Sequence, residues 1–166
     1  MEQAKIERKL FAHYIDSAIP GASETKYVRL GDDLEEFNIS MNANVETKNN
    51  ICGETSVVIG SYQPQAEVDT YYAEKGSPLS ERLQKIIDER LVLDDLKTTV
   101  IEAHVYEPDS QGSGQYVAYK EDAIIEVKSY GGNNTGYQIP FTYHCTGNRV
   151  KGVFNPTTKM FTADNA

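Results

Sequence analysis

The sequence has no tryptophan, and only two cysteines and three histidines occur among its 166 residues. The two cysteines form no CxxC pair and no ligand cluster with a histidine, which argues against a zinc site. A structural disulfide between them stays open as an alternative, although a reducing compartment disfavours it. No apolar run approaches the roughly 20 residues that a membrane helix needs, and the charged opening residues lack the apolar core of a signal peptide. We therefore expect a chain that is made and kept in the cytoplasm, with no membrane partner.

Basic residues are also scarce. The chain carries 16 Lys and Arg against 25 Asp and Glu, a formal net charge of −9. Tight binding to nucleic acid requires clustered cations that displace counterions, so the composition argues against it. It does not exclude DNA passing nearby, because a surface of the same sign repels DNA instead of holding it. Solubility alone is the simpler explanation of the same charge.

Helical periodicity is confined to one segment, residues 77–90. Ser77 is suited to the N-cap and Pro78 to the first helical position, and we expect the helix to end near Arg90. Its apolar stripe, which should pack on a sheet, consists of Leu79, Leu83, Ile86 and Ile87.

The rest of the chain has the composition of β-structure. Aromatic and β-branched runs are broken at short intervals by Gly, Pro, Asn and Asp. The length fits one domain, residues 1–166, that buries its own core. We expect a mainly β (α+β) domain with one packed helix, built either as a sandwich of two sheets or as a partly closed barrel.

The most informative stretch is a long polar segment, residues 45–56, between two β-type runs. A polar excursion of this length in a compact domain is usually functional or disordered, and the apolar runs on both sides should anchor it. The pattern predicts a projecting hairpin that contacts another protein chain.

Nothing in the sequence forms a catalytic set. His144 and Cys145 are adjacent, but neighbours on a strand point to opposite faces, and we expect both Cys52 and Cys145 to be free thiols. The glycine-rich residues 131–136 lack the context of a phosphate loop and predict a turn. A group of acidic residues near a turn consists of Asp32, Asp33, Glu35 and Glu36. No nucleophile or metal ligand lies near them in the sequence. We expect no enzyme activity, no metal and no cofactor.

Three segments resemble the major tail tube proteins of long-tailed, non-contractile bacteriophages and prophages, and the resemblance extends over nearly the whole chain. The first segment is residues 8–14. The second is residues 44–51 with Gly53-Glu54-Thr55, and the third is residues 138–141 followed by residues 146–152. The two cysteines depart from the family's pattern.

The resemblance implies a β-sandwich-like core with a flanking helix and a long loop, in subunits that join as hexameric rings and stack into a hollow tube. It also implies that the hairpin, residues 45–56, and the N-terminal segment, residues 1–14, contact the adjoining ring. The inter-ring contact residues would be Glu46, Thr47, Lys48, Asn49, Asn50, Ile51 and Glu54.

The resemblance further implies that double-stranded phage DNA passes through the lumen, with tape-measure, tail terminator and distal tail proteins as partners. The protein would be assembled in the host bacterial cytoplasm and would reside in the virion tail. Candidates for lumen-facing acids, from their places on the polar sides of central strands, are Glu102, Glu121 and Glu126. An ordinary solvated strand face explains these three residues equally well.

Two alternatives remain open. The inner-tube protein of a contractile tail or of a secretion-like machine would share the architecture. A carbohydrate-binding β-sandwich would explain the eleven tyrosines, since aromatic faces stack on sugars, although core packing explains tyrosines as well.

Overall fold

The computed structural model describes residues 3–110, 112 and 114–164. Twelve strands, one α-helix and two short 3-10 helices follow one another along the chain. Their bounds are η1 Arg8–Leu10, β1 Phe11–Asp16, β2 Tyr27–Leu30, β3 Ile39–Ser40, β4 Ala43–Asn49, β5 Thr55–Tyr62, β6 Gln65–Val68, α1 Pro78–Glu89, η2 Leu93–Leu96, β7 Lys97–Pro108, β8 Tyr116–Val127, β9 Gly131–Asn133, β10 Gly136–Gln138, β11 Phe141–Asn155 and β12 Met160–Ala163.

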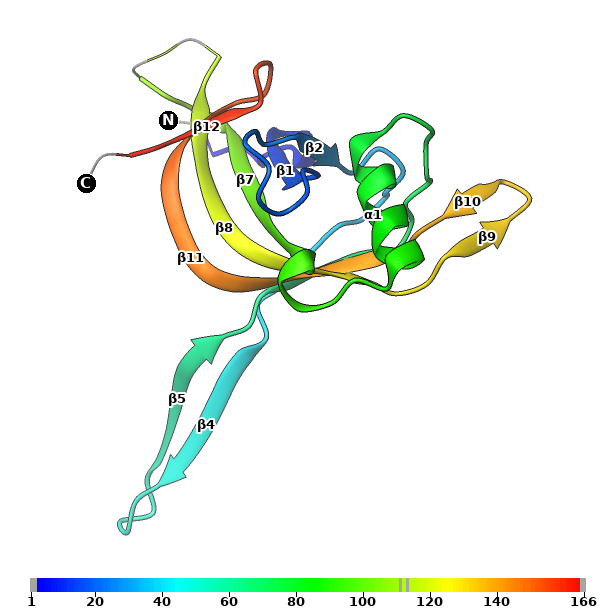
Figure 1. Ribbon diagram of the computed structural model, residues 1–166. Helices are drawn as coiled ribbons and strands as arrows, with labels where there is room; N and C mark the ends of the chain where they lie inside the picture. The colour runs from blue at the N-terminus through cyan, green and yellow to red at the C-terminus, as the bar shows by residue number, and fades with distance from the viewer. Residues whose placement is uncertain (1–2, 111, 113, 165–166) are drawn as a thin grey trace.

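One antiparallel sheet organises the domain. Its strand order is β2-β1-β7-β8-β11-β6-β3, and β12 pairs with the far end of β11. Two separate ribbons, β4-β5 and β9-β10, leave this sheet as hairpins. The long strands β7, β8 and β11 curl into a half-barrel, the sheet continues through β1 and β2, and α1 lies on its concave side (Figure 1).

The mainly β fold with one packed helix is confirmed. Of the two architectures that the sequence left open, the main sheet is a single curled sheet and not a pair of stacked sheets. Register shifts in β11 between Cys145 and Gly147 and between Gly147 and Val150, and in β7 between His104 and Pro108, mark bulges. Bulges increase local twist, so long strands can curl without splitting into two sheets.

The core consists of two clusters on opposite faces of the sheet. Consecutive residues of one strand point to opposite faces, and Ile15 and Val100 lie in the first cluster while Tyr14 and Ile101 lie in the second. The second cluster is closed by Phe154, whose ring lies 4.6 Å from that of Tyr14. The strands are therefore buried on both faces over much of their length.

The helix α1 packs on the first cluster. Its predicted stripe is confirmed, since Leu79, Leu83, Ile86 and Ile87 are all buried there. Pro78 occupies the first helical turn, and Arg90 ends the helix in the left-handed conformation with φ 50°. Ser77 stands at the N-cap position without a side-chain capping bond.

A buried arginine on α1 was not expected from the apolar stripe. Arg82 donates to the backbone carbonyl of Asp16 at 3.0 Å and to that of Lys97. Burial lowers the pKa of Arg82 from its ordinary value, and the nearby Asp16 opposes that shift. The guanidinium thus ties the helix to the end of β1 and the start of β7.

The longest strand, β11, runs from Phe141 to Asn155. Pro140 lies in the break between β10 and β11, where its missing amide hydrogen removes no hydrogen bond from a strand pair. Residues 109–115 join β7 to β8, and residues 111 and 113 lie outside the described part of the chain.

Replacing Leu83 by Ala is expected to lower the free energy of unfolding by about 2–5 kcal/mol, because the side chain is fully buried between helix and sheet. Urea denaturation followed by circular dichroism measures the loss. Lys85→Ala, on the exposed side of the same helix, is the matched control and should change stability by no more than about 0.5 kcal/mol. Equal losses in the two variants would contradict the packing described here.

Candidate assembly site: the projecting hairpin and the groove at its base

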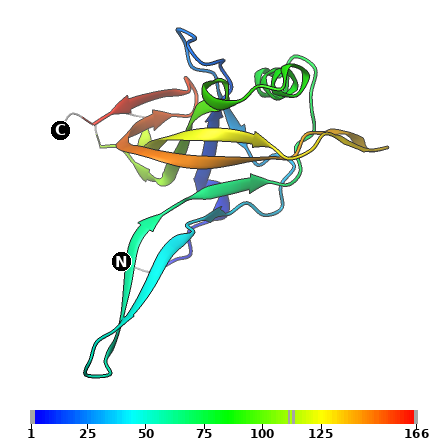
Figure 2. The same cartoon turned by 60° about the horizontal axis from the view of Figure 1, so that its bottom comes forward.

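The hairpin of β4 and β5 projects from the domain as a two-stranded ribbon. Both figures of the whole chain show it extending past the edge of the curled sheet (Figures 1 and 2). Every residue of both strands is exposed. The expected excursion, residues 45–56, is therefore part of a longer ribbon that starts at Ala43 and ends at Tyr62.

The sequence led us to expect that the apolar run after this excursion anchors it in the core. The structure shows that it does not. Val57 and Ile59 belong to the ribbon itself, with 64% and 50% of their surfaces exposed. The anchor lies at the base instead. The amide of Gln63 donates to the carbonyl of Met41 at 3.1 Å, and Asn42 Nδ2 donates to the carbonyl of Gln63 at 3.0 Å.

The strand register gathers the apolar side chains of the ribbon on one face. Val45 pairs with Ile59, and Thr47 pairs with Val57. Residues directly opposite or two apart share a face of a ribbon. Val58 pairs with Glu46 and lies on the other face together with charged and polar residues. We call the face of Val45, Val57 and Ile59 the apolar face of the hairpin. In one copy of the chain it faces solvent.

The tip of the hairpin is tightly organised. Asn50 Oδ1 accepts hydrogen bonds from the amides of Cys52 and Glu54 at 3.0 and 2.9 Å, and its Nδ2 donates to Glu54 Oε2 at 2.8 Å. Gly53 has φ 80°, which other residues rarely adopt. These bonds present Ile51 at the apex of the turn, where the residue is fully exposed.

All seven residues expected to make inter-ring contacts lie on this hairpin. Glu46, Thr47, Lys48 and Asn49 are on β4, and Asn50, Ile51 and Glu54 are in the turn. All seven are exposed. The sequence pattern missed the apolar residues of β5, because Val57, Val58 and Ile59 form a continuous apolar run in which no alternation shows the face of each side chain.

A groove of about 750 Å³ opens at the base of the hairpin. Its apolar lining consists of Phe11, Phe37, Ile39, Met41, Tyr62 and Pro64. Its polar lining includes Arg8, Glu102, Glu121 and Arg149. Tyr62 is the last residue of β5 and pairs with Ala43, so it lies on the apolar face of the ribbon. The apolar face is thus continuous with the groove.

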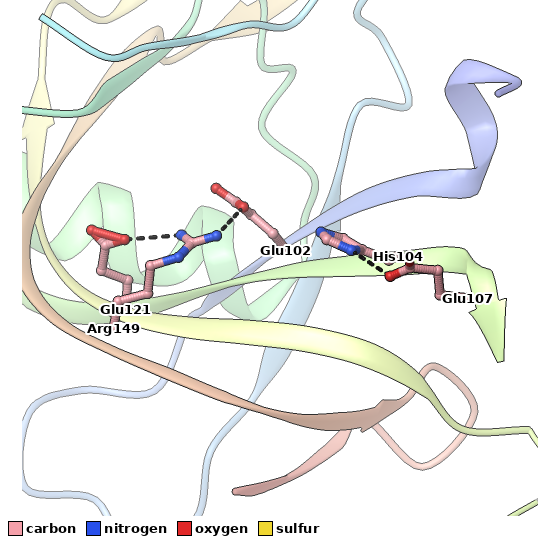
Figure 3. A network of polar contacts seen from close by, with 5 residues as sticks. All are labelled: Glu102, His104, Glu107, Glu121 and Arg149. Atoms are coloured by element: carbon pink, nitrogen blue, oxygen red, sulfur yellow. Dashed lines mark hydrogen bonds and ion pairs between the residues drawn. The ribbon is translucent and has the colours of Figure 1, made fainter. Parts of the chain in front are cut away.

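Two of the three candidate lumen acids meet in the wall of this groove. Arg149 lies between them, with its guanidinium 2.8 Å from Glu102 Oε2 and 3.1 Å from Glu121 Oε1 (Figure 3). The same guanidinium covers the ring of Tyr119 at 4.5 Å. Hydrogen bonds and attraction from both carboxylates raise the pKa of Arg149 against the opposing effect of its burial. The acids are partly neutralised, and Glu121 is buried.

The third acid, Glu126, does not join them. It lies five residues beyond Glu121 on β8, and an odd spacing along a strand places two side chains on opposite faces. Its carboxylate contacts His144 Nε2 at 2.7 Å and Lys128 Nζ at 3.2 Å. The hydrogen bond from His144 lowers the pKa of Glu126. The sequence placed each acid on the polar side of its own strand, and in the structure Glu126 lies on the face of β8 opposite to that of Glu121.

Sequence reasoning did not identify Arg149 as a partner of these acids. The residue reaches them because β11 is bulged between Cys145 and Val150, where Gly147 has φ 117° and Asn148 has φ 57°. A Gly-Asn pair inside a strand is a known bulge signal. A bulge changes which face the following residues occupy, and strict alternation along β11 could not have placed Arg149.

His104 lies near the network, on β7. Its Nδ1 is 3.1 Å from Glu107 Oε2 (Figure 3), and its ring stacks on Tyr106 at 5.3 Å. His104 thus has a carboxylate partner on the more polar face of β7. Glu102 and His104 share that face with Val100, which packs in the core instead.

A second histidine, His13, is buried in the floor of the groove. Arg8 Nη2 lies 3.0 Å from His13 Nε2 and also donates to the carbonyl of Phe37 at 3.0 Å. Burial, followed by the charges of Arg8 and Arg29, lowers the pKa of His13 from 6.5 to about 3. A neutral ring with Nε2 as acceptor fits the donation from Arg8.

Cys52 and Cys145 are both free, as expected, and burial, then the charge of Glu121, raises the pKa of Cys145 to about 12, which keeps its thiol protonated. Among residues 3–110, 112 and 114–164, no group of three His, Cys, Asp or Glu side chains is placed to hold a metal ion. Asp32, Asp33, Glu35 and Glu36 lie in the connection after β2, and none of them forms an ion pair there.

No helix within the described residues is both long enough and apolar enough to span a membrane. Neither the protein-family models nor the curated proteins include one that matches this chain.

His13→Gln is expected to reduce the acid sensitivity of the fold. The unfolded chain binds a proton at this site below pH 6.5, whereas the folded chain does so only near pH 3. The stabilisation is therefore complete above pH 6.5 and is lost as the pH falls towards 3. Between pH 7 and pH 4 the native free energy of unfolding should fall by about 3 kcal/mol more than that of the variant. Parallel pH profiles from urea denaturation would refute this assignment.

Proposed function

We propose that this protein is the subunit of a hollow tail tube, in which hexameric rings stack and phage DNA passes through the lumen. One observation carries the proposal: a hairpin with a hydrogen-bonded tip exposes its apolar face, and none of the residues that the structure describes covers that face. A two-stranded ribbon alone is marginally stable in water. An exposed apolar surface of this kind is typical of a protein contact site.

The curled sheet supports ring formation. Its order begins with β2 and ends with β3, and each of these strands has one unpaired side within the described chain. Open strand edges accept further strands from other chains. If the edge at β2 of one subunit meets the edge near β3 of the next, the contact is heterologous, and such contacts close into rings when the rotation between subunits permits.

The charge of the chain supports passage of DNA without retention. The net charge is −9, and the acids of the groove are held by Arg149, so this wall is weakly polar and not basic. A basic lining would hold phosphates through many simultaneous contacts. Glu102 and Glu121 remain candidates for one lining face, and Glu126 would contribute only if the opposite face of β8 faced the lumen.

Tape-measure, tail terminator and distal tail proteins, and a location in the virion tail, follow from the same proposal. The inner tube of a contractile tail or of a secretion-like machine would use the same hairpin and sheet edges, and it remains the alternative within this class. The presence or absence of a surrounding sheath in the assembled particle distinguishes the two.

The carbohydrate-binding alternative has less support. Sugar sites use several aromatic faces exposed together. Here Tyr14, Tyr27 and Tyr143 are buried in the core, and the exposed rings lie on separate elements. Tyr62 is at the hairpin base, whereas Tyr130 lies near α1, where Arg90 donates to its hydroxyl at 3.1 Å.

The proposal is tested by electron microscopy of negatively stained protein across a concentration series. The comparison variant replaces residues 48–56 by Asn-Gly, a turn that closes the ribbon after the Thr47–Val57 pair. We expect rings and hollow filaments from the intact chain, and folded monomers or single rings from the shortened chain. The shortened chain should keep its circular dichroism spectrum, because the removed residues contribute nothing to the core.

Long hollow filaments from the shortened chain would contradict a stacking role for the hairpin. Intact protein that stays monomeric at every concentration would contradict unaided polymerisation.

A further inference from the structure

We infer that the hairpin tip of one copy of this chain binds in the groove at the hairpin base of a second copy, with Ile51 as its apolar anchor and Glu54 facing Arg8. The inference rests on the proposed function and goes beyond it by naming the receptor surface. The groove would be an acceptor site for a peptide turn that presents an isoleucine and a glutamate.

The tip is built as a rigid anchor. The three hydrogen bonds of the Asn50 side chain and the bond from Gly53 N to Asn50 O at 3.1 Å fix the turn before any contact is made. Thr55 Oγ1 adds a bond to Asn49 Oδ1 at 2.8 Å. Binding a preformed turn costs less conformational entropy than binding a flexible one. An isoleucine fixed in full exposure gains the most from entering an apolar pocket.

The groove has the chemistry to receive this side chain. Phe37, Met41 and Tyr62 supply apolar walls, and its volume of about 750 Å³ accommodates several side chains together. Met41 and Tyr62 are each 52% exposed in the single chain, although both are large and apolar. A partner bound in the groove would take these two side chains out of water.

The charges of the two surfaces are complementary. Within the described residues Arg8 forms no ion pair, since its guanidinium contacts two backbone carbonyls and His13. Glu54 likewise forms no ion pair there, and its carboxylate accepts only from Asn50. Glu102 and Glu121, which would repel the tip, are already held by Arg149. A second copy of the chain would therefore bring Glu54 to Arg8, the groove arginine that has no carboxylate partner among the described residues.

The geometry of the pair explains why the contact would repeat. Tip and groove lie at opposite ends of the same ribbon, and seven residues of β4 span roughly 24 Å at the usual rise of a strand. A tip bound to the base of another copy is a heterologous contact that leaves one free tip and one free groove. Contacts of this type propagate along an axis.

Disulfide trapping tests the pairing with a cysteine that the chain already has. Cys52 is exposed beside Ile51, and the only other thiol is removed by Cys145→Ser. In that background Met41→Cys places a thiol in the groove wall. The control is Val92→Cys, a position 62% exposed and outside the groove. Each protein is treated with the thiol oxidant diamide and analysed on non-reducing gels, with the linked peptides identified by mass spectrometry.

The expected result is a reducible ladder that extends beyond dimers in the Met41→Cys protein, with position 41 linked to Cys52. This linkage should exceed that of position 92 to Cys52 by about tenfold or more, because bound partners hold the thiols at a high effective concentration. Equal linkage at positions 41 and 92, or Cys52 pairs alone, would overturn the inference. Untreated samples are imaged in parallel. Filaments without the 41–52 linkage overturn only the inference, whereas the absence of both overturns the proposed function as well.

A second measurement does not depend on the introduced cysteine. Ile51→Thr in the otherwise native chain should raise the concentration at which filaments appear by about tenfold, because the variant buries less apolar surface in the groove. Val92→Thr is its control and should leave that concentration unchanged. An unchanged concentration for Ile51→Thr would also overturn the inference.

Discussion

A two-stranded ribbon has no third layer to cover it, and this constraint governs the protein. The register of β4 and β5 places Val45, Val57 and Ile59 on one face, and no segment of the described chain lies over them. In a monomer these side chains remain in water, which opposes the stability of the ribbon. In the proposed tube another chain would cover the apolar face, so assembly would be a consequence of how the hairpin is paired. The rest of the fold holds that hairpin in place.

The domain makes a firm base for this ribbon. The strands that flank it, β3 and β6, pair with each other and, through β6, with β11 at the end of the curled sheet. The amide of Cys145 donates to the carbonyl of Pro64 at 2.8 Å, which extends this attachment. On the same side of the sheet, the Arg149 network and the Arg8–His13 contact line the groove beside the ribbon. The groove and the base of the hairpin are therefore joined by backbone hydrogen bonds to the same end of the curled sheet.

The sequence was a good guide wherever local chemistry decides the structure. Helical spacing located α1 with its buried stripe, and the polar excursion at residues 45–56 located the hairpin. It failed where a bulge or a tertiary contact decides. Strict alternation could not foresee that a bulge in β11 brings Arg149 to two acids. The sequence also led us to expect that the β-branched run of β5 anchors the excursion, because pairing with β4 away from the sheet is invisible in composition. A sandwich and a partly closed barrel were both compatible with the sequence, and the bulged, curled single sheet decides between them.

The most direct measurement of the central claim is sedimentation velocity of two threonine variants over a range of concentrations. Val45→Thr, Val57→Thr and Ile59→Thr together remove the apolar face while keeping β-branched side chains suited to a strand. Val58→Thr makes the same chemical change on the opposite face. The account predicts that the triple variant stays small at concentrations where the native chain and Val58→Thr form large assemblies. Native-like assembly of the triple variant would contradict it.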